Sequence, residues 1–139
     1  MENLGNLHPE VISMKWIKTV GYFCLGGSAY VALELLWRGW SHVSMFVAGG
    51  VAFLLLGQLR LVAGKWPLLW RGLAGAGVIT AVELAVGLVV NREYGVWDYR
   101  GMPLNFMGQI CAPFCLLWIP ISLVAMGIHG ELEKRYSAE

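Results

Sequence analysis

The sequence predicts an all-α integral membrane protein, a four-helix transmembrane bundle in which residues 1–139 form a single domain. The first observation is the composition: 58% of the residues are apolar and only 14% are charged, whereas globular domains contain about 25% charged residues. A chain of this length cannot bury so much apolar surface in a water-soluble core. The second is the 18 glycines, which are costly in soluble helices but let transmembrane helices approach closely. The third is a series of four long apolar runs.

These apolar runs define the expected spans, at residues 19–37, 43–62, 68–90 and 104–128. Each run is long enough, because about 20 residues of α-helix cross a hydrocarbon core of about 30 Å. We expect Pro67 and Pro103 to start the third and fourth helices, since proline is favoured at the first helical position. Residues 9–18 form either a short helix lying at the membrane interface or an extension of the first span.

The distribution of lysine and arginine predicts that both termini are cytoplasmic. Seven of these residues lie on the side of the N-terminus, the second loop and the C-terminus: Lys15, Lys18, Arg60, Lys65, Arg71, Lys134 and Arg135. Three lie on the opposite, outer side: Arg38, Arg92 and Arg100. Positive residues accumulate in cytoplasmic loops, which gives this orientation. The formal net charge of +1 shows no basic excess of the kind that binds nucleic acid, so no nucleic-acid partner is expected.

Two acidic residues, Glu34 and Glu83, lie inside the expected spans. A charged side chain at the centre of a transmembrane helix costs about 2.5–3.5 kcal/mol and therefore usually faces the bundle interior. Asn105 and Gln109, near the start of the expected fourth helix, fall at a similar depth in the outer part of the membrane. We therefore expect these four side chains to converge in a ligand-binding site. The alternative is that they only hold the helices together.

Two further features adjoin this cluster. Arg38 follows Glu34 by four residues, the favourable order for an ion pair within a helix, and His42 lies four residues further on. Pro113 cannot donate to the carbonyl group four residues before it, which leaves the backbone oxygen of Gln109 without a helical donor. We therefore include Arg38 and His42 among the candidate ligand-binding residues.

The connection between the third and fourth spans carries Trp97, Asp98 and Tyr99. We expect these residues to cover the polar cluster as a lid, with Asp98 held by Arg38 or by a backbone amide of its own turn, because a shielded carboxylate needs donors. The alternative is that Trp97 and Tyr99 belong to the aromatic belt found at membrane interfaces.

The sequence predicts no cofactor and no metal site, and it leaves an enzymatic activity open but less favoured. The three cysteines, Cys24, Cys111 and Cys115, lie in the expected spans, where cysteine is ordinary packing, and an odd number makes no disulfide framework. The sequence shows no pattern that would pair a catalytic nucleophile with a general base. The only Gly-Lys pair is followed by Trp66, which does not fit a P-loop, so this chain carries no ATPase motif.

An ordered series of motifs runs from about residue 30 to residue 118: LELLWRGWSHVSM at 33–45, GG at 49–50, ITAVE at 79–83, Asn91, WDY at 97–99, PLN at 103–105 and GQIC at 108–111. This series resembles the bacterial membrane family labelled putative ABC-transporter type IV. The resemblance implies a small multi-pass protein of the bacterial cytoplasmic (inner) membrane, and its label implies a permease component whose ATP hydrolysis comes from a separate ATPase chain.

Together these observations favour a permease-like component that binds or transports a small or lipid-like ligand in the outer half of the bundle. Four helices are few to enclose a path, so we expect a homodimer or other membrane subunits as partners, besides membrane lipid. Two alternatives stay open: a structural or interaction subunit of a membrane complex, and an intramembrane enzyme that acts on a lipid headgroup.

Overall fold

The computed structural model describes residues 9–138, and in that range it contains four long helices and no β-strand: α1 Pro9–Arg38, α2 Val43–Ala63, α3 Leu68–Val90 and α4 Ala112–Ala138. Each helix includes a segment that is long and apolar enough to cross a membrane. The predicted all-α four-helix class is therefore confirmed. The orientation of the termini relative to the membrane stays a prediction.

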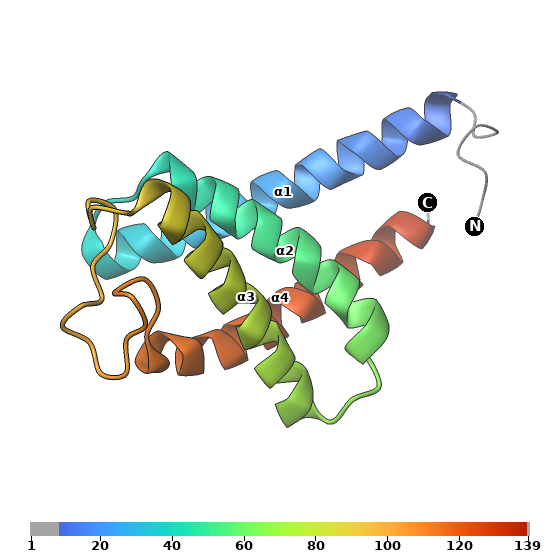
Figure 1. The fold of residues 1–139 in the computed structure, drawn as a ribbon. Coiled ribbons are helices and arrows are strands. Elements are labelled where there is room, and N and C mark those ends of the chain that lie inside the picture. Colours follow the sequence, from blue (N-terminus) through green and yellow to red (C-terminus); the bar gives the residue numbers. More distant parts are fainter. Residues whose placement is uncertain (1–8, 139) are drawn as a thin grey trace.

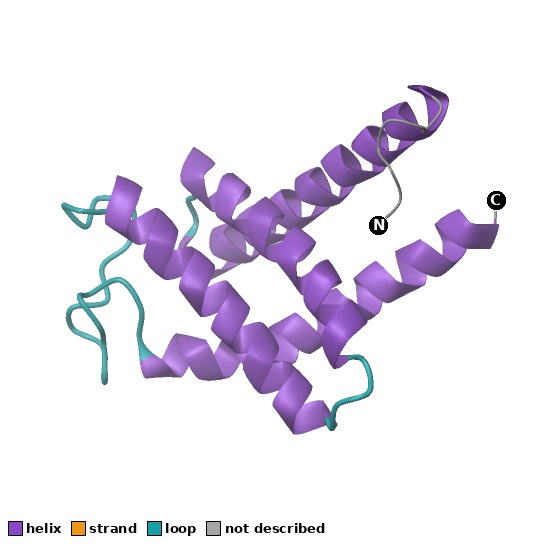
Figure 2. Ribbon diagram, turned by 45° about the vertical axis from the view of Figure 1, so that its right-hand side comes forward, coloured by secondary structure: helices purple, strands orange, loops and turns teal. Residues whose placement is uncertain are grey.

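The four helices form two crossing pairs. Helices α2 and α3 lie side by side and cross the pair α1 and α4 obliquely (Figures 1 and 2). Helix α2 packs against all three other helices, and the main apolar core lies between α2, α3 and α4. We call the end with connections 39–42 and 91–111 the loop end. We call the opposite end the termini end; it contains connection 64–67, the start of α1 at Pro9 and the end of α4 at Ala138.

Glycines bring α1 and α2 into close contact. A Cβ atom added to Gly26 would lie 2.6 Å from the backbone oxygen of Gly49, and one added to Gly49 would lie 2.6 Å from the backbone oxygen of Gly26. Gly27 and Gly50 meet Phe46 and Phe23 in the same way. Only residues without a side chain permit this approach, which explains why glycine occupies these four positions.

The helix boundaries decide between the two alternatives for residues 9–18 and differ from the expected starts at both prolines, Pro67 and Pro103. Helix α1 runs through residues 9–18 without a break, so these residues extend the first helix. Helix α4 begins at Ala112, so the expected start of a helix at Pro103 and residue 104 is wrong. Leu104, Met107 and Gly108 have φ angles of 50°, 55° and 65°, which no right-handed helix accommodates. Pro67 precedes the first residue of α3 instead of occupying it.

Candidate functional site

The first group of polar side chains lies inside the bundle toward the loop end, around Glu83 of α3. Only 4% of Glu83 is exposed, so it faces the interior as expected. The hydroxyl group of Tyr30, on α1, donates a hydrogen bond of 2.9 Å to Oε1 of Glu83. The Tyr30 ring packs against Trp118 of α4, with the ring centroids 5.8 Å apart. Residues from three helices therefore surround one buried carboxylate.

Arg38 connects α1 to the loop end. Its Nε atom lies 2.5 Å from Oε2 of Glu34, which confirms the expected ion pair within the helix. Its Nη1 atom donates a hydrogen bond of 2.6 Å to the backbone oxygen of Val96, and its guanidinium group lies over the Trp40 ring at 4.1 Å from the centroid. Arg38 thus neutralises Glu34 and holds the long connection against α1.

His42 does not continue the first helix, and its part in a ligand site stays a prediction. Helix α1 ends at Arg38, and Gly39 has a φ angle of 77°, so the helix does not continue to His42. His42 instead caps the start of α2, where its Nδ1 atom accepts a hydrogen bond of 3.1 Å from the backbone amide of Ser44. Among the hydrogen bonds of residues 9–138, none joins His42 to either glutamate.

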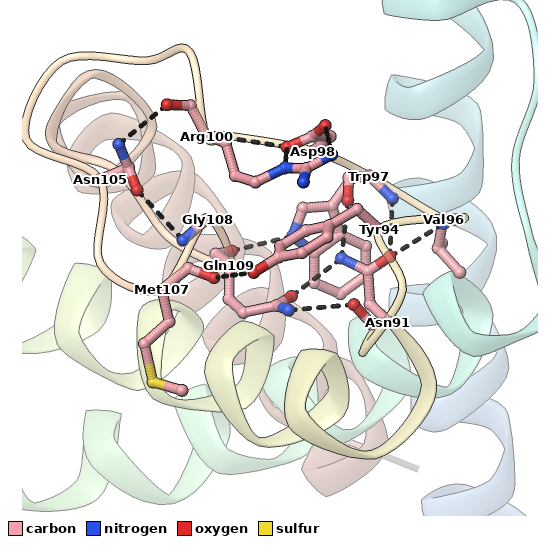
Figure 3. Close-up of polar contacts among 10 residues, drawn as sticks. All are labelled: Asn91, Tyr94, Val96, Trp97, Asp98, Arg100, Asn105, Met107, Gly108 and Gln109. Carbon is pink, nitrogen blue, oxygen red and sulfur yellow. Dashed lines mark hydrogen bonds and ion pairs between the residues drawn. The ribbon is translucent and has the colours of Figure 1, made fainter.

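Asn91 organises the 91–111 connection (Figure 3). It is completely buried, and its Nδ2 atom donates hydrogen bonds to the backbone oxygen of Trp97 at 2.7 Å and to Oε1 of Gln109 at 2.8 Å. Its Oδ1 atom accepts hydrogen bonds from the backbone amides of Val96 at 2.8 Å and Trp97 at 3.0 Å. One side chain therefore satisfies polar groups from both halves of the connection, a role that sequence reasoning missed.

Gln109 completes this network and does not join the glutamates. Its Nε2 atom donates to the backbone oxygen of Asn91 at 3.0 Å, so both ends of its amide group bond to Asn91. Its backbone oxygen, expected to lack a helical donor, accepts a hydrogen bond of 2.8 Å from Nε1 of Trp97. Asn105 is exposed and closes a separate turn by hydrogen bonds to Met102 and Gly108. The expected position of Asn105 and Gln109 inside the fourth helix is therefore wrong, because α4 begins at Ala112, and their part in a ligand site stays a prediction.

Trp97 and Tyr99 point into the protein. Trp97 is 7% exposed and packs with Met45, at the start of α2. Tyr99 stacks on Phe114 of α4, with ring centroids 5.0 Å apart and planes inclined by 14°. Burial raises the pKa of Tyr99, and the carboxylates of Glu83 and Glu34 raise it further. The connection thus brings an aromatic residue into the electrostatic field of the buried Glu83 and the half-buried Glu34.

Asp98, between these two aromatic residues, faces outward. It accepts a hydrogen bond of 3.0 Å from the backbone amide of Arg100 and forms an ion pair of 2.8 Å with the Arg100 side chain. Hydrogen bonding by Arg100 lowers the pKa of Asp98 to about 2. Of the two expected partners, the backbone amide of its own turn is confirmed, whereas Arg38 bonds to Val96 instead.

An apolar groove separates α1 from α4. No Cα atom of α1 comes within 8 Å of a Cα atom of α4 in the described helices, although side chains join them at both ends. Lys18 and Glu133 form an ion pair of 2.8 Å at the termini end, and Trp37 packs against Phe114 at the loop end. Between them lies a groove of about 500 Å³, lined by side chains that include Leu25, Ala29, Leu33, Leu36, Ile121 and Val124.

The groove leads toward the buried carboxylate. A cavity of about 80 Å³ shares Ala29, Leu33 and Ile121 with the groove and extends inward to Tyr30 and Trp118. Tyr30 lines this inner cavity and donates its hydrogen bond to Glu83, which itself lines neither the cavity nor the groove. An amphipathic molecule could place an apolar chain in the groove and a polar group near this pair.

Comparison with known proteins identifies the family. Residues 16–137 match the family described as "Putative ABC-transporter type IV". The chain belongs to this family. No curated protein and no solved structure matches the chain significantly.

Membership of the ABC-transporter type IV family agrees with the four candidate spans and indicates a multi-pass membrane protein with membrane-embedded partners. Within residues 9–138, the histidine, cysteine, aspartate and glutamate side chains form no group of three that could hold a metal ion. The described cysteines are free: Cys24 is exposed, Cys111 is buried and Cys115 is partly buried. In the group of polar side chains around Glu83 and Glu34, the groups available for a ligand are the two carboxylates, Tyr30 and Arg38.

Proposed function

We propose that this chain is a permease-like membrane component that binds a lipid-like ligand between α1 and α4, with the polar group of the ligand held at Tyr30 and Glu83. The observation that supports the proposal is that Tyr30, the hydrogen-bond donor to Glu83, lines the small cavity that continues the apolar groove inward. The groove suits an alkyl chain, since ligand sites are mostly apolar with a few placed polar groups.

The chemistry of Glu83 indicates what the polar group would be. A carboxylate can accept about four hydrogen bonds, and a buried carboxylate needs donors or a positive charge. Tyr30 supplies one donor. The positive charge of Arg38 is directed to Glu34 and to the backbone of Val96. A ligand with an ammonium or hydroxyl group therefore complements Glu83 better than an anionic ligand does.

The 91–111 connection would act as the lid of this site. Trp97 and Tyr99 supply its inward-facing side chains, and Asp98 stabilises its outer turn through Arg100. The Arg38–Val96 hydrogen bond ties the lid to the same helix that carries Tyr30 and Glu34.

Transport by this component would require further subunits. Four helices with an open groove between α1 and α4 do not enclose a path, so a second copy or another membrane subunit would complete it, and the family name supports a separate ATPase chain. Leu36 and Trp37 of α1 are 86% and 75% exposed, which favours contact with lipid or with a partner helix. The same surface supports the second candidate, an interaction subunit of a membrane complex.

Substitution of Glu83 by glutamine tests the binding site. The experiment measures thermal unfolding of the full chain in phosphatidylcholine nanodiscs with dodecylamine, dodecanol or dodecanoate as probes. We expect dodecylamine to stabilise the wild-type protein most strongly, by about 2.7 kcal/mol at a concentration of 100 times Kd. Glu83→Gln should abolish the preference for the amine without changing the stability of the protein alone.

Glu93→Gln is the matched control, because Glu93 is an exposed glutamate in the 91–111 connection. This variant should retain the full response to dodecylamine. If Glu83→Gln and the wild type respond equally, Glu83 only stabilises the packing of the helices and the proposed site is wrong.

A further inference from the structure

A second cavity lies at the termini end of the bundle, away from the Tyr30–Glu83 pair. It has a volume of about 350 Å³ and is formed by α2, α3, α4 and the start of the 64–67 connection. Three cationic side chains line it: Arg60 near the end of α2, Arg71 in the first turn of α3 and Lys134 near the end of α4. Glu131 is the acidic side chain in its wall. The cavity therefore has an excess of positive charge.

Both arginines carry buried donors that have no acceptor. The Nε atoms of Arg60 and Arg71 are inaccessible to solvent and form no hydrogen bond. In the described part of the chain, the ion pairs involve other residues, so Glu131 does not neutralise Arg60, Arg71 or Lys134. A buried guanidinium N–H group without an acceptor is unfavourable. The cavity therefore offers an anion three cationic side chains that no ion pair within residues 9–138 neutralises.

The geometry favours a phosphate group over a simple halide. A guanidinium group presents a planar set of N–H donors that matches two oxygens of one phosphate, and two arginines on neighbouring helices can share its oxygens. Leu68, at the start of α3, also lines the cavity, and no side chain caps this helix. The free backbone amides of that first turn add partial positive charge next to Arg71.

The rest of the wall indicates that the phosphate belongs to a lipid. Leu68, Leu123 and Met126 provide an apolar surface beside the cations, as expected for a group that continues into an acyl chain. The cavity lies at the ends of helices that are long and apolar enough to span a membrane, which is the depth of lipid headgroups. Basic cavities between transmembrane helices at this depth suit anionic lipid headgroups.

We propose that the Arg60–Arg71–Lys134 cavity binds the headgroup of an anionic phospholipid, with the phosphate on the two arginines. Glu131 indicates which anionic headgroup fits, because its carboxylate accepts hydrogen bonds from headgroup hydroxyls and repels a headgroup carboxylate. Phosphatidylglycerol, with one negative charge and two hydroxyl groups, has the required chemistry. This site is independent of the proposed function of the groove, since none of its residues lines that groove.

Native mass spectrometry of the full chain tests the assignment. The detergent-solubilised protein is titrated with phosphatidylglycerol, with phosphatidylethanolamine of the same acyl chains, and with phosphatidylglycerol in the presence of inorganic phosphate. We expect tighter binding of phosphatidylglycerol than of phosphatidylethanolamine, and weak competition by inorganic phosphate. The variant Arg60→Gln/Arg71→Gln should lower the affinity for phosphatidylglycerol by about tenfold or more, because two charge-assisted hydrogen-bonding groups are lost.

Arg92→Gln is the matched control, since Arg92 is an arginine at the loop end whose Nε atom donates to the backbone oxygen of Leu88. It should bind phosphatidylglycerol like the wild type. Lys134→Gln, at an exposed position, provides a second test if the double variant does not fold, and it should also weaken binding. Equal loss in the control, unchanged binding in the cavity variants, or full displacement by inorganic phosphate would each overturn the lipid assignment.

Discussion

Replacement of Asn91 by alanine should disorder the 91–111 connection. The side chain makes four hydrogen bonds, two as donor to Trp97 and Gln109 and two as acceptor from the amides of Val96 and Trp97. Each contributes about 1 kcal/mol net, so their sum is about 4 kcal/mol. All the partners are buried, and truncation leaves them without a partner unless the connection opens to water.

Asn105→Ala provides a control of the same residue type in the same connection. Asn105 also makes three hydrogen bonds, to Arg100, Met102 and Gly108, but its side chain is exposed. Water replaces those bonds after truncation, so we expect a loss below about 1 kcal/mol. The contrast between the two asparagines isolates burial as the cause of the effect.

Two measurements on the detergent-solubilised protein follow the change. Equilibrium unfolding in mixed micelles gives the difference in the free energy of unfolding. Hydrogen–deuterium exchange reports on the backbone amides of Val96 and Trp97, which donate hydrogen bonds to Oδ1 of Asn91 in the native state. In Asn91→Ala these amides should exchange much faster, while the centre of α3 keeps its protection. Equal effects of Asn91→Ala and Asn105→Ala, with Val96 and Trp97 still protected, would refute the reasoning.

Two further predictions concern orientation and helix packing. In a chain whose native cysteines are replaced by alanine, a cysteine at Gly95 should react with an impermeant thiol reagent outside intact cells, whereas one at Trp66 should not; the reverse pattern would place the loop end in the cytoplasm. Gly26→Ala should destabilise the protein by about 1–3 kcal/mol, because the new Cβ atom would meet the backbone of Gly49. Gly77→Ala is the control and should not destabilise the protein, because a Cβ atom there meets no atom within 4 Å. Equal stabilities of the two variants in unfolding assays would argue against close α1–α2 packing.

The candidate site shows where reading the sequence succeeds and where it stops. The Glu34–Arg38 pair follows from a spacing of four residues within one helix, and its geometry depends only on the helical repeat. Burial of Glu83 follows from the cost of a charge in lipid. Tyr30 was missed because a tyrosine within an apolar run carries no local signal of its partner. Only the tertiary arrangement, in which α2 packs against both α1 and α3, brings its hydroxyl group to Glu83.

The fourth helix illustrates a conflict between local and tertiary preferences. Residues 104–111 are mostly apolar, so composition alone continues the span through them. The backbone instead turns at Leu104, Met107 and Gly108, which have positive φ angles, Gln109 bonds to Asn91 and Trp97, and α4 begins at Ala112. No periodicity in the sequence reports hydrogen bonds between residues 18 positions apart.

The sequence by itself determined the fold class. The length of its apolar runs and the small number of charged residues can be read directly from it, and inside a membrane such runs form helices because their backbone groups must bond to each other. It also determined which charged residues need partners inside the bundle. The tertiary structure alone decided which partners they have, how the 91–111 connection closes on Asn91, and where the groove and the basic cavity lie. These features depend on the distances between helices, which result from the packing of many side chains at once and leave no pattern in any single segment.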